Sequence, residues 1–132
     1  MKKKHVFDAG VISLYFAGRD DVKRYFNEIF KGDAEGFICE VNLAEFYYKA
    51  IKKIGLEATE IRYIAIREKL NVGTPDEKMT RDAARIKARH ENTLSLADSY
   101  TIALNEKVKG TLLTTDSGIK NSKETKTILI KI

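Results

Sequence analysis

Short, continuously apolar runs alternate with amphipathic segments along the chain, and this alternation constrains the fold more than any other feature. The apolar runs are "HVFD", "GFICEV", "GTLLTTD" and "TKTILIKI". Between the first two, residues 20–32 repeat hydrophobic side chains at helical spacing and end in a glycine. Strands that are apolar throughout and separated by helices are typical of parallel sheets buried on both faces. The sequence therefore predicts an α/β fold with a mostly parallel sheet of four to five strands flanked by helices on both faces.

Length and composition narrow the class of protein. With 132 residues the chain can form one domain with a substantial core, so we expect a single domain over residues 1–132. No apolar run approaches the roughly 20 residues that cross a bilayer, and the start lacks the apolar stretch of a signal peptide. The single cysteine, Cys39, excludes an internal disulfide, so we expect a cytoplasmic protein. The net charge of +5 favours a polyanionic partner.

Two of the predicted strands are followed by aspartate. Asp8 ends "HVFD", before an expected turn at Gly10, and Asp116 ends "LLTTD". In parallel α/β sheets, ligands bind beyond the carboxyl ends of the strands, so both carboxylates are expected at one crevice. The alternative at this point is structural, because aspartate also begins turns and caps helices.

Asp98 is the only charged residue in the stretch "LSLADSYTIAL". It can form a capping box with Ser95, in which each side chain bonds the backbone amide of the other residue. No cation follows one turn later to balance its charge on this largely apolar helix. Such a cap offsets only about 1 kcal/mol of the cost of burying a carboxylate, whereas a divalent cation would offset far more. A metal-binding role is therefore the stronger hypothesis.

Glu45 carries the weakest signal of the four acids considered. In "NLAE", Asn42 is the expected N-cap and Glu45 the third helical residue. Glu45 points away from the apolar face of its helix, and Lys49 follows at the spacing of an ion pair. Its helix nevertheless starts directly after the second predicted strand, at the carboxyl edge of the sheet.

Four carboxylates at one crevice would repel one another, and a divalent metal ion relieves that repulsion. Mg²⁺ and Mn²⁺ prefer oxygen ligands, and a pair of such ions can activate water and stabilise the leaving oxygen of a phosphodiester. The two histidines, His5 and His90, stand apart from any cysteine or histidine cluster, which argues against zinc. The sequence also lacks the glycine-rich fingerprints of nucleotide-binding loops.

The stretches "VFDAGVISLYF", "VNLAEF", "LSLADSYTIAL" and "LLTTD", in this order, resemble the PIN-domain ribonucleases, and most of all the small VapC-type toxins of toxin–antitoxin pairs. The resemblance covers nearly the whole chain. It implies a Rossmann-like sheet, Mg²⁺- or Mn²⁺-dependent endonucleolytic cleavage of RNA, a homodimer, and an antitoxin that blocks the site. The family's catalytic and metal-binding acids fall on Asp8, Glu45, Asp98 and Asp116.

The resemblance also implies supporting residues. Thr114 matches a hydroxyl that helps to hold the family's site. After the first aspartate the family usually has hydroxyl-bearing residues or asparagine, whereas this chain has Ala9 and Gly10. We expect Ser13 to supply part of that support. Among the basic residues, Lys49 and Lys120 follow candidate acids closely in the sequence, so they are the expected contacts for RNA phosphates.

Two other functions compete with a nuclease. The substitution at Ala9 and Gly10 motivates the first, a PIN-like module that binds RNA or protein but has lost its chemistry. The second is a phosphoacceptor domain with a similar sheet. That site needs an acidic pair beside its acceptor strand, and "HVFDAG" contains only Asp8, which argues against it.

Overall fold

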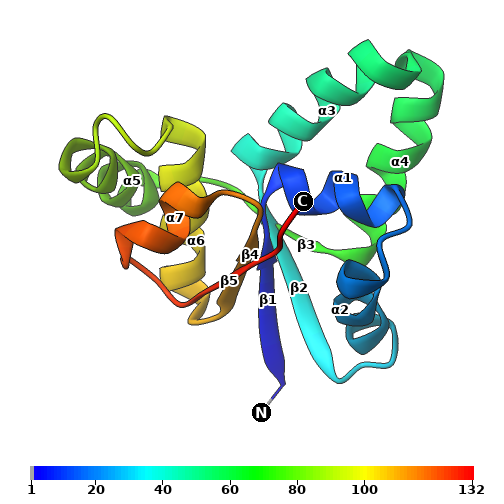
Figure 1. Ribbon diagram of the computed structural model, residues 1–132, viewed down its shortest axis with the longest axis horizontal. Helices are drawn as coiled ribbons and strands as arrows, with labels where there is room; N and C mark the ends of the chain where they lie inside the picture. The colour runs from blue at the N-terminus through cyan, green and yellow to red at the C-terminus, as the bar shows by residue number, and fades with distance from the viewer. Residues whose placement is uncertain (1) are drawn as a thin grey trace.

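The computed structural model describes residues 2–132 and contains a five-stranded sheet in which every neighbouring pair of strands is parallel (Figure 1). The strand order is β3-β2-β1-β4-β5. This arrangement confirms the predicted α/β fold. The strands are β1 (Lys3–Phe7), β2 (Ala34–Cys39), β3 (Asn71–Gly73), β4 (Thr111–Thr114) and β5 (Thr127–Leu129).

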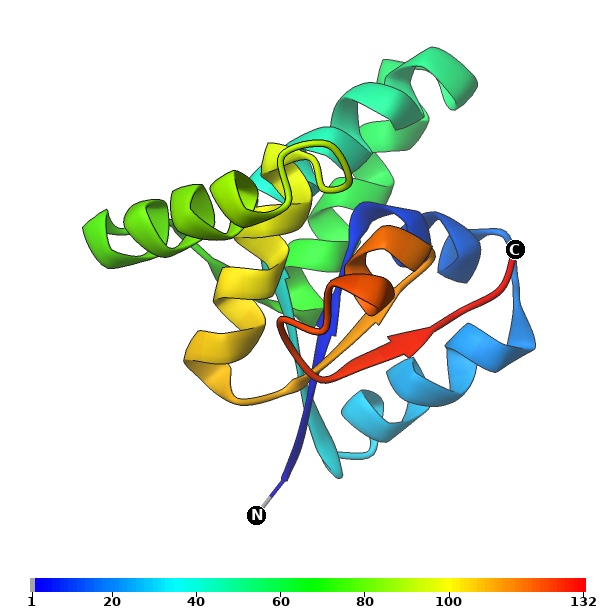
Figure 2. The same cartoon turned by 60° about the vertical axis from the view of Figure 1, so that its left-hand side comes forward.

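Helices cover both faces of the sheet, as predicted (Figures 1 and 2). Four of them pack on one face: α1 (Ala9–Phe16), α2 (Asp20–Phe30), α3 (Glu40–Ile54) and α4 (Leu56–Lys69). The other face is covered by α5 (Glu77–Arg89), α6 (Leu96–Val108) and α7 (Ser117–Ser122). No helix within residues 2–132 is long and apolar enough to span a membrane.

Successive residues of the central strands enter two different hydrophobic cores. Phe7 and Leu113 belong to the core beneath α1–α4, while their neighbours Val6 and Leu112 belong to the core beneath α5–α7. All four side chains are fully buried. Burying each such side chain contributes roughly 1.5–3 kcal/mol, which explains why successive residues of these strands are apolar where both faces are covered.

The strand order creates a switch point between β1 and β4. After β1 the chain builds β2 and β3 on one side, and it then crosses to β4 on the other side of β1. At such a point the connections leave the sheet in opposite directions and open a crevice at the carboxyl ends of the strands. The N-terminal end of β1 lies at the opposite end of the molecule (Figure 1).

Two local predictions from the sequence are wrong. Gly10 does not form a turn, because α1 begins at Ala9 and continues to Phe16. The glycine is required for space instead, since a Cβ at this position would collide with the hydroxyl of Thr115.

Asn42 is not the N-cap of α3, because that helix begins two residues earlier, at Glu40. The Asn42 side chain is buried and donates hydrogen bonds to the Thr101 hydroxyl and, at 3.5 Å, to the Ala97 carbonyl of α6. Glu45 therefore lies in the second turn of the helix rather than in a capping box.

An ion-pair cluster fixes the segment after α7, and it should make stability depend on pH. Glu124 accepts two hydrogen bonds from Arg89 at 2.8 and 2.9 Å and lies 2.8 Å from His90 Nε2. The hydrogen bonds from Arg89 lower the pKa of Glu124 to about 2, from an ordinary value of 4.5. Because the folded-state pKa is depressed, this stabilisation is present above about pH 4.5 and disappears as the pH falls towards 2.

We therefore expect Glu124→Gln to lower the free energy of unfolding by about 1–2 kcal/mol near pH 6, a value reduced for solvent screening of this cluster. Urea unfolding at pH 6 and at pH 2.5 would measure the change. At the lower pH, which is still above the folded-state pKa of about 2, the difference between the two proteins should shrink to about a quarter. An equal loss at both pH values would contradict the assignment of the effect to the Glu124 charge.

Candidate active site at the carboxyl edge of the sheet

Asp8 follows β1 directly and is held by three hydrogen bonds. Its Oδ1 accepts from the Val11 amide at 2.8 Å, so it caps α1, and its Oδ2 accepts from the Thr114 hydroxyl and, at 3.4 Å, from the Thr115 amide. The side chain is buried, with 7% of the residue exposed. Burial raises the pKa of the Asp8 carboxyl above its ordinary value, and the negative charge of Asp98 raises it further.

Asp116 lies beyond the neighbouring strand β4 and is joined to Asp8 through Thr114. The Thr114 hydroxyl donates to Asp8 and accepts the Asp116 backbone amide at 3.0 Å. The Asp116 carboxylate caps α7 by accepting the Gly118 amide at 2.7 Å. Thr114 is fully buried, so one hydroxyl orients both strand-end acids. These bonds support the role that the family resemblance implied for it.

Asp98 reaches the same crevice from the first turn of α6. It forms the predicted capping box with Ser95, with both hydrogen bonds at 3.0 Å. Burial is the main cause that raises the pKa of Asp98, and the nearby Asp116 carboxyl raises it further. The capping box of the structural explanation is therefore present, and the same cap fixes the Asp98 carboxylate near another acid.

The three aspartates form a chain of mutual repulsion, from Asp8 to Asp98 and from Asp98 to Asp116. In the described part of the chain, no Lys, Arg or His forms a salt bridge with any of them. Buried carboxylates without a cation partner are costly, and a bound cation would remove that cost.

This donor set fits Mg²⁺ or Mn²⁺ by its chemistry, since all of its donors are carboxylate oxygens. However, the three carboxylates do not converge on a single point. Within residues 2–132 no group of three His, Cys, Asp or Glu side chains is arranged as a ready metal cage. Mg²⁺ commonly keeps several of its waters and uses only one or two carboxylates, so a closed protein cage is not required for it.

Glu45, unlike the three aspartates, is paired with a cation. It lies in α3, and its carboxylate is 3.9 Å from the Lys49 ammonium group, in the i,i+4 pair that the sequence predicted. Asn42 and Thr101, which bond to each other, lie three residues before Glu45 and three residues after Asp98. This contact fixes α3 against α6, the two helices that carry these acids.

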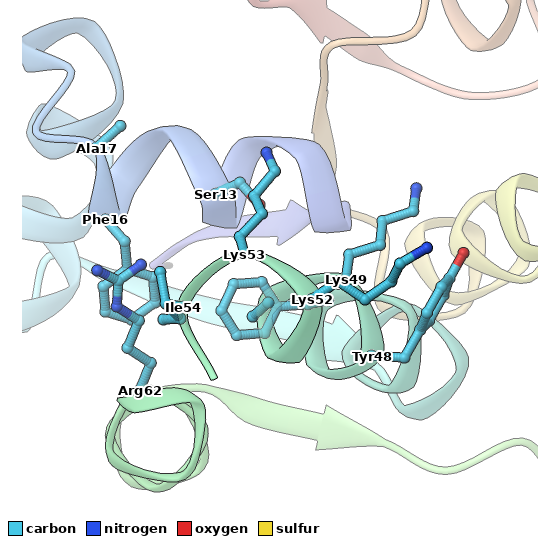
Figure 3. Close-up of a pocket in the computed structure, with 11 residues that line it drawn as sticks. Ser13, Phe16, Ala17, Tyr48, Lys49, Lys52, Lys53, Ile54 and Arg62 are labelled. Carbon is cyan, nitrogen blue, oxygen red and sulfur yellow. The ribbon is translucent and has the colours of Figure 1, made fainter. Parts of the chain in front are cut away.

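The other expected contacts are placed as follows. Ser13 makes no hydrogen bond to any of the four acids within residues 2–132; it lines a pocket of about 570 Å³ between α1, α3 and α4 (Figure 3). Lys49 lines the same pocket together with Lys52 and Lys53, and Figure 3 shows the three amines at its rim. Lys120 donates to the Thr127 carbonyl at 3.2 Å, so its amine is already engaged.

Thr115 is a residue of this site that sequence reasoning missed. Its amide bonds Asp8, and its hydroxyl occupies the space that a side chain at position 10 would take. The Thr115 hydroxyl therefore fills the space beside Gly10, where this chain has no side chain. The only signal in the sequence was the combination of Gly10 with two adjacent threonines, and their proximity appears only in the folded chain.

A family model for the PIN domain matches residues 5–124, which is most of the chain. No curated protein sequence matches the chain. Thus the family match and the structural matches are what relate this chain to known proteins.

Solved structures share the fold at low sequence identity. A chain of the DNA-bound VapBC from Salmonella typhimurium superposes with a TM-score of 0.75 at 15% identity, covering 97% of this chain and 98% of that chain. VapBC2 from Rickettsia felis, bound to a promoter DNA fragment, gives 0.74 at 16% identity, with 95% and 97% covered. Mycobacterium tuberculosis VapC20, described as a sarcin-ricin loop cleaving toxin, gives 0.65 at 19% identity, with 82% and 86% covered. At these identities the likeness establishes the fold.

Proposed function

Because this chain belongs to the PIN-domain family, we propose that it is a Mg²⁺- or Mn²⁺-dependent endoribonuclease that hydrolyses RNA phosphodiesters at the carboxyl edge of its sheet. One observation carries the proposal. Asp98 is close enough to Asp8 and to Asp116 for their charges to interact, and no cation of the described chain pairs with any of the three. Three uncompensated acids at a switch-point crevice favour a site for metal-assisted phosphoryl chemistry.

Asp8, Asp98 and Asp116 would hold the metal, with Glu45 as the fourth acid once it leaves Lys49. When bound, the ion would supply a water of lowered pKa and neutralise charge on the phosphate. The chain's own contribution is orientation. Thr114 aligns Asp8 with the backbone of Asp116, and the Ser95 cap fixes Asp98. Fixed carboxylates need no rearrangement to receive the ion, which is what preorganisation requires.

We further propose that the protein is the toxin of a toxin–antitoxin pair, with an antitoxin partner and a homodimeric assembly in the cytoplasm. The related structures described as VapBC and the VapC20 toxin support this role. The α3–α4 hairpin also exposes five large apolar side chains, a cluster typical of a protein interface: Tyr48, Ile54, Leu56, Ile61 and Ile64.

The second candidate function is a PIN-like module that binds RNA or protein without cleaving it. The observations that favour it are the open arrangement of the acids and the Glu45–Lys49 ion pair. The two functions differ in metal binding, because a module without chemistry has no need to hold Mn²⁺. Calorimetric titration with Mn²⁺ distinguishes them.

The test of the main proposal is direct. The purified protein should cut a structured RNA in the presence of Mn²⁺, and EDTA should stop the reaction. The Asp8→Asn variant, purified in the same way, controls for contaminating nuclease, because it would retain any contaminant while losing its own activity. The absence of metal-dependent cleavage on a panel of structured and single-stranded RNAs, together with no calorimetric signal for Mn²⁺, would contradict it.

A further inference from the structure

The proposed active site has a shortage of positive charge. Its three aspartates carry no cation partner, and RNA is itself a polyanion. The two lysines expected there are engaged, Lys49 with Glu45 and Lys120 with a backbone carbonyl. Most of the affinity of proteins for nucleic acid comes from phosphate contacts with Lys and Arg. These two lysines are engaged, so other cations must contribute to such contacts.

A basic hollow lies at the opposite edge of the sheet. It has a volume of about 920 Å³ and is lined by the start of β1, the end of α6, the start of β4, β5 and one side of α2. We call it the amino-edge hollow. Its cations are Lys2, Lys3, Lys4, Arg24, Lys109 and Lys126.

The amino-edge hollow concentrates the charge of the protein. Six cations face only two carboxylates there, Glu28 and Glu35, which leaves a net +4 in a chain whose total is +5. Of the six cations, only Lys3 forms a salt bridge within residues 2–132, at 3.1 Å to Glu28. Five cations are thus free of a carboxylate partner, and like charges kept this close are destabilising unless an anion joins them.

A buried histidine on the wall of the hollow also lacks a hydrogen-bond partner. His5 is only 5% exposed, and neither ring nitrogen makes a hydrogen bond in the described structure. Its Nε2 lies 3.3 Å from a Glu28 oxygen without hydrogen-bond geometry. Buried polar groups are normally satisfied by protein or by water, so His5 adds a polar group that can accept or donate a hydrogen bond on the wall of the charged hollow.

We propose that the amino-edge hollow is a phosphate-backbone site for RNA, which anchors the substrate away from the point of cleavage. The inference rests on the proposed nuclease function. The hollow is far larger than a single carboxylate requires, and its cations come from several separate segments: the start of β1, α2, the residue after α6 and the residue before β5. Such a spread suits a chain of several phosphates better than one anion. RNA is favoured over an acidic protein because an RNA substrate continues on both sides of the bond that is cut, so a second part of it can bind away from the active site.

The distance between the two sites sets how the anchor acts. Five residues of β1 separate Lys3 from Asp8, which is about 17 Å at the rise of a strand. Charge interactions through water fade over about 8 Å at physiological salt, so the hollow does not influence the chemistry at Asp8 electrostatically. An RNA of at least about five nucleotides is needed to reach both sites. The anchor therefore contributes to binding and not to the chemical step.

The test compares the double variant Lys109→Gln/Lys126→Gln with the control double variant Lys78→Gln/Lys87→Gln on α5. Both remove two surface charges, and the control lysines lie outside the hollow. Fluorescence anisotropy with a labelled 20-nucleotide single-stranded RNA is measured in EDTA, so no cleavage is required. We expect the hollow variant to bind about fivefold more weakly or worse, with a salt slope reduced by about 1.4, while the control binds like the wild type.

Two results with the RNA would overturn the inference: no loss of affinity in the hollow variant, or an equal loss in both variants. A third result would also overturn it, namely that the hollow variant binds RNA like the wild type but loses affinity for a polyglutamate peptide measured in parallel. The last would identify a protein-binding surface instead. In the Mn²⁺ cleavage reaction the hollow variant should raise KM and leave kcat unchanged. If no cleavage occurs at all, the proposed function fails, whereas the anisotropy result still decides the inference.

Discussion

Replacing Asp8 by asparagine should slow Mn²⁺-dependent RNA cleavage by about 1000-fold or more while the protein stays folded. The loss corresponds to about 4 kcal/mol, which is in the range that a misplaced catalytic metal costs. Asparagine is as good an N-cap as aspartate, and its carbonyl oxygen can still accept the Val11 amide. The measurement is the single-turnover cleavage rate, with far-ultraviolet circular dichroism as the check on folding.

The matched control is Asp82→Asn, which removes the same charge from an ion pair with Lys78 on the surface of α5. It should cleave at the wild-type rate. If Asp8→Asn retained more than a tenth of the activity, Asp8 would not be part of the metal site. Glu45→Gln separates the fourth acid from the others: we expect a smaller loss than for Asp8, because Glu45 must first leave Lys49.

Replacing Asp98 by asparagine should remove most of the thermal stabilisation that Mn²⁺ gives to the protein. At a Mn²⁺ concentration 100 times the dissociation constant, binding adds about 2.7 kcal/mol, which raises the Tm of a chain of this size by about 8–13 °C. The Asp98→Asn variant should lose most of that increase. Differential scanning fluorimetry with and without Mn²⁺, and with Ca²⁺ as a second ion, measures it.

Without metal, the same variant should be more stable than the wild type at pH 7, by about 1 kcal/mol. The pKa of Asp98 is raised in the folded state, first by burial and then by Asp116, so its ionisation opposes folding. The contribution of Asp98 to the free energy of unfolding is greatest below the pKa that it has in the unfolded state. That contribution is lost as the pH rises through its pKa in the folded state. A neutral asparagine removes that loss and keeps the bond from the Ser95 amide.

The sign of this change decides between the two explanations of Asp98. If the capping box were its only role, Asp98→Asn would be neutral or destabilising without metal, and Mn²⁺ would stabilise the variant as it stabilises the wild type. A gain in the metal-free state with a lost response to Mn²⁺ is expected only of a carboxylate held beside other acids for an ion. The Asp82→Asn variant should show neither effect.

The sequence predicted the fold because hydrophobic patterning is a local property. Runs such as "HVFD" and "LLTTD" place two apolar residues side by side just before their polar ends, and a strand buried on both faces satisfies that pattern. The capping box at Ser95 and the Glu45–Lys49 pair were also predicted, because both join residues three or four apart in one helix. The family match over residues 5–124 agrees with the family that these stretches resemble.

The sequence did not predict contacts that join distant segments. Asn42 looked like an N-cap, but its amide is buried against Thr101. Gly10 looked like a turn, but it makes room for Thr115, which is more than a hundred residues away in the sequence. Neither Thr101 nor Thr115 is marked as a partner by its spacing or residue type. Rules based on neighbouring residues therefore assigned Asn42 to a helix cap and Gly10 to a turn.

Periodicity and residue type in the sequence by themselves determined the parallel sheet and its helical layers, since these depend on which residues must be buried. They also singled out Asp8, Asp98 and Asp116 as candidate acids, whereas Glu45 joined them mainly through the family resemblance. The tertiary structure alone decided which acids meet. It brings Asp98 near Asp8 and Asp116, leaves Glu45 with Lys49, and separates the acidic edge from the basic hollow at the other end of the strands. The reason is that electrostatic coupling depends on distance through space, and the strand order that sets those distances is a property of the assembled sheet.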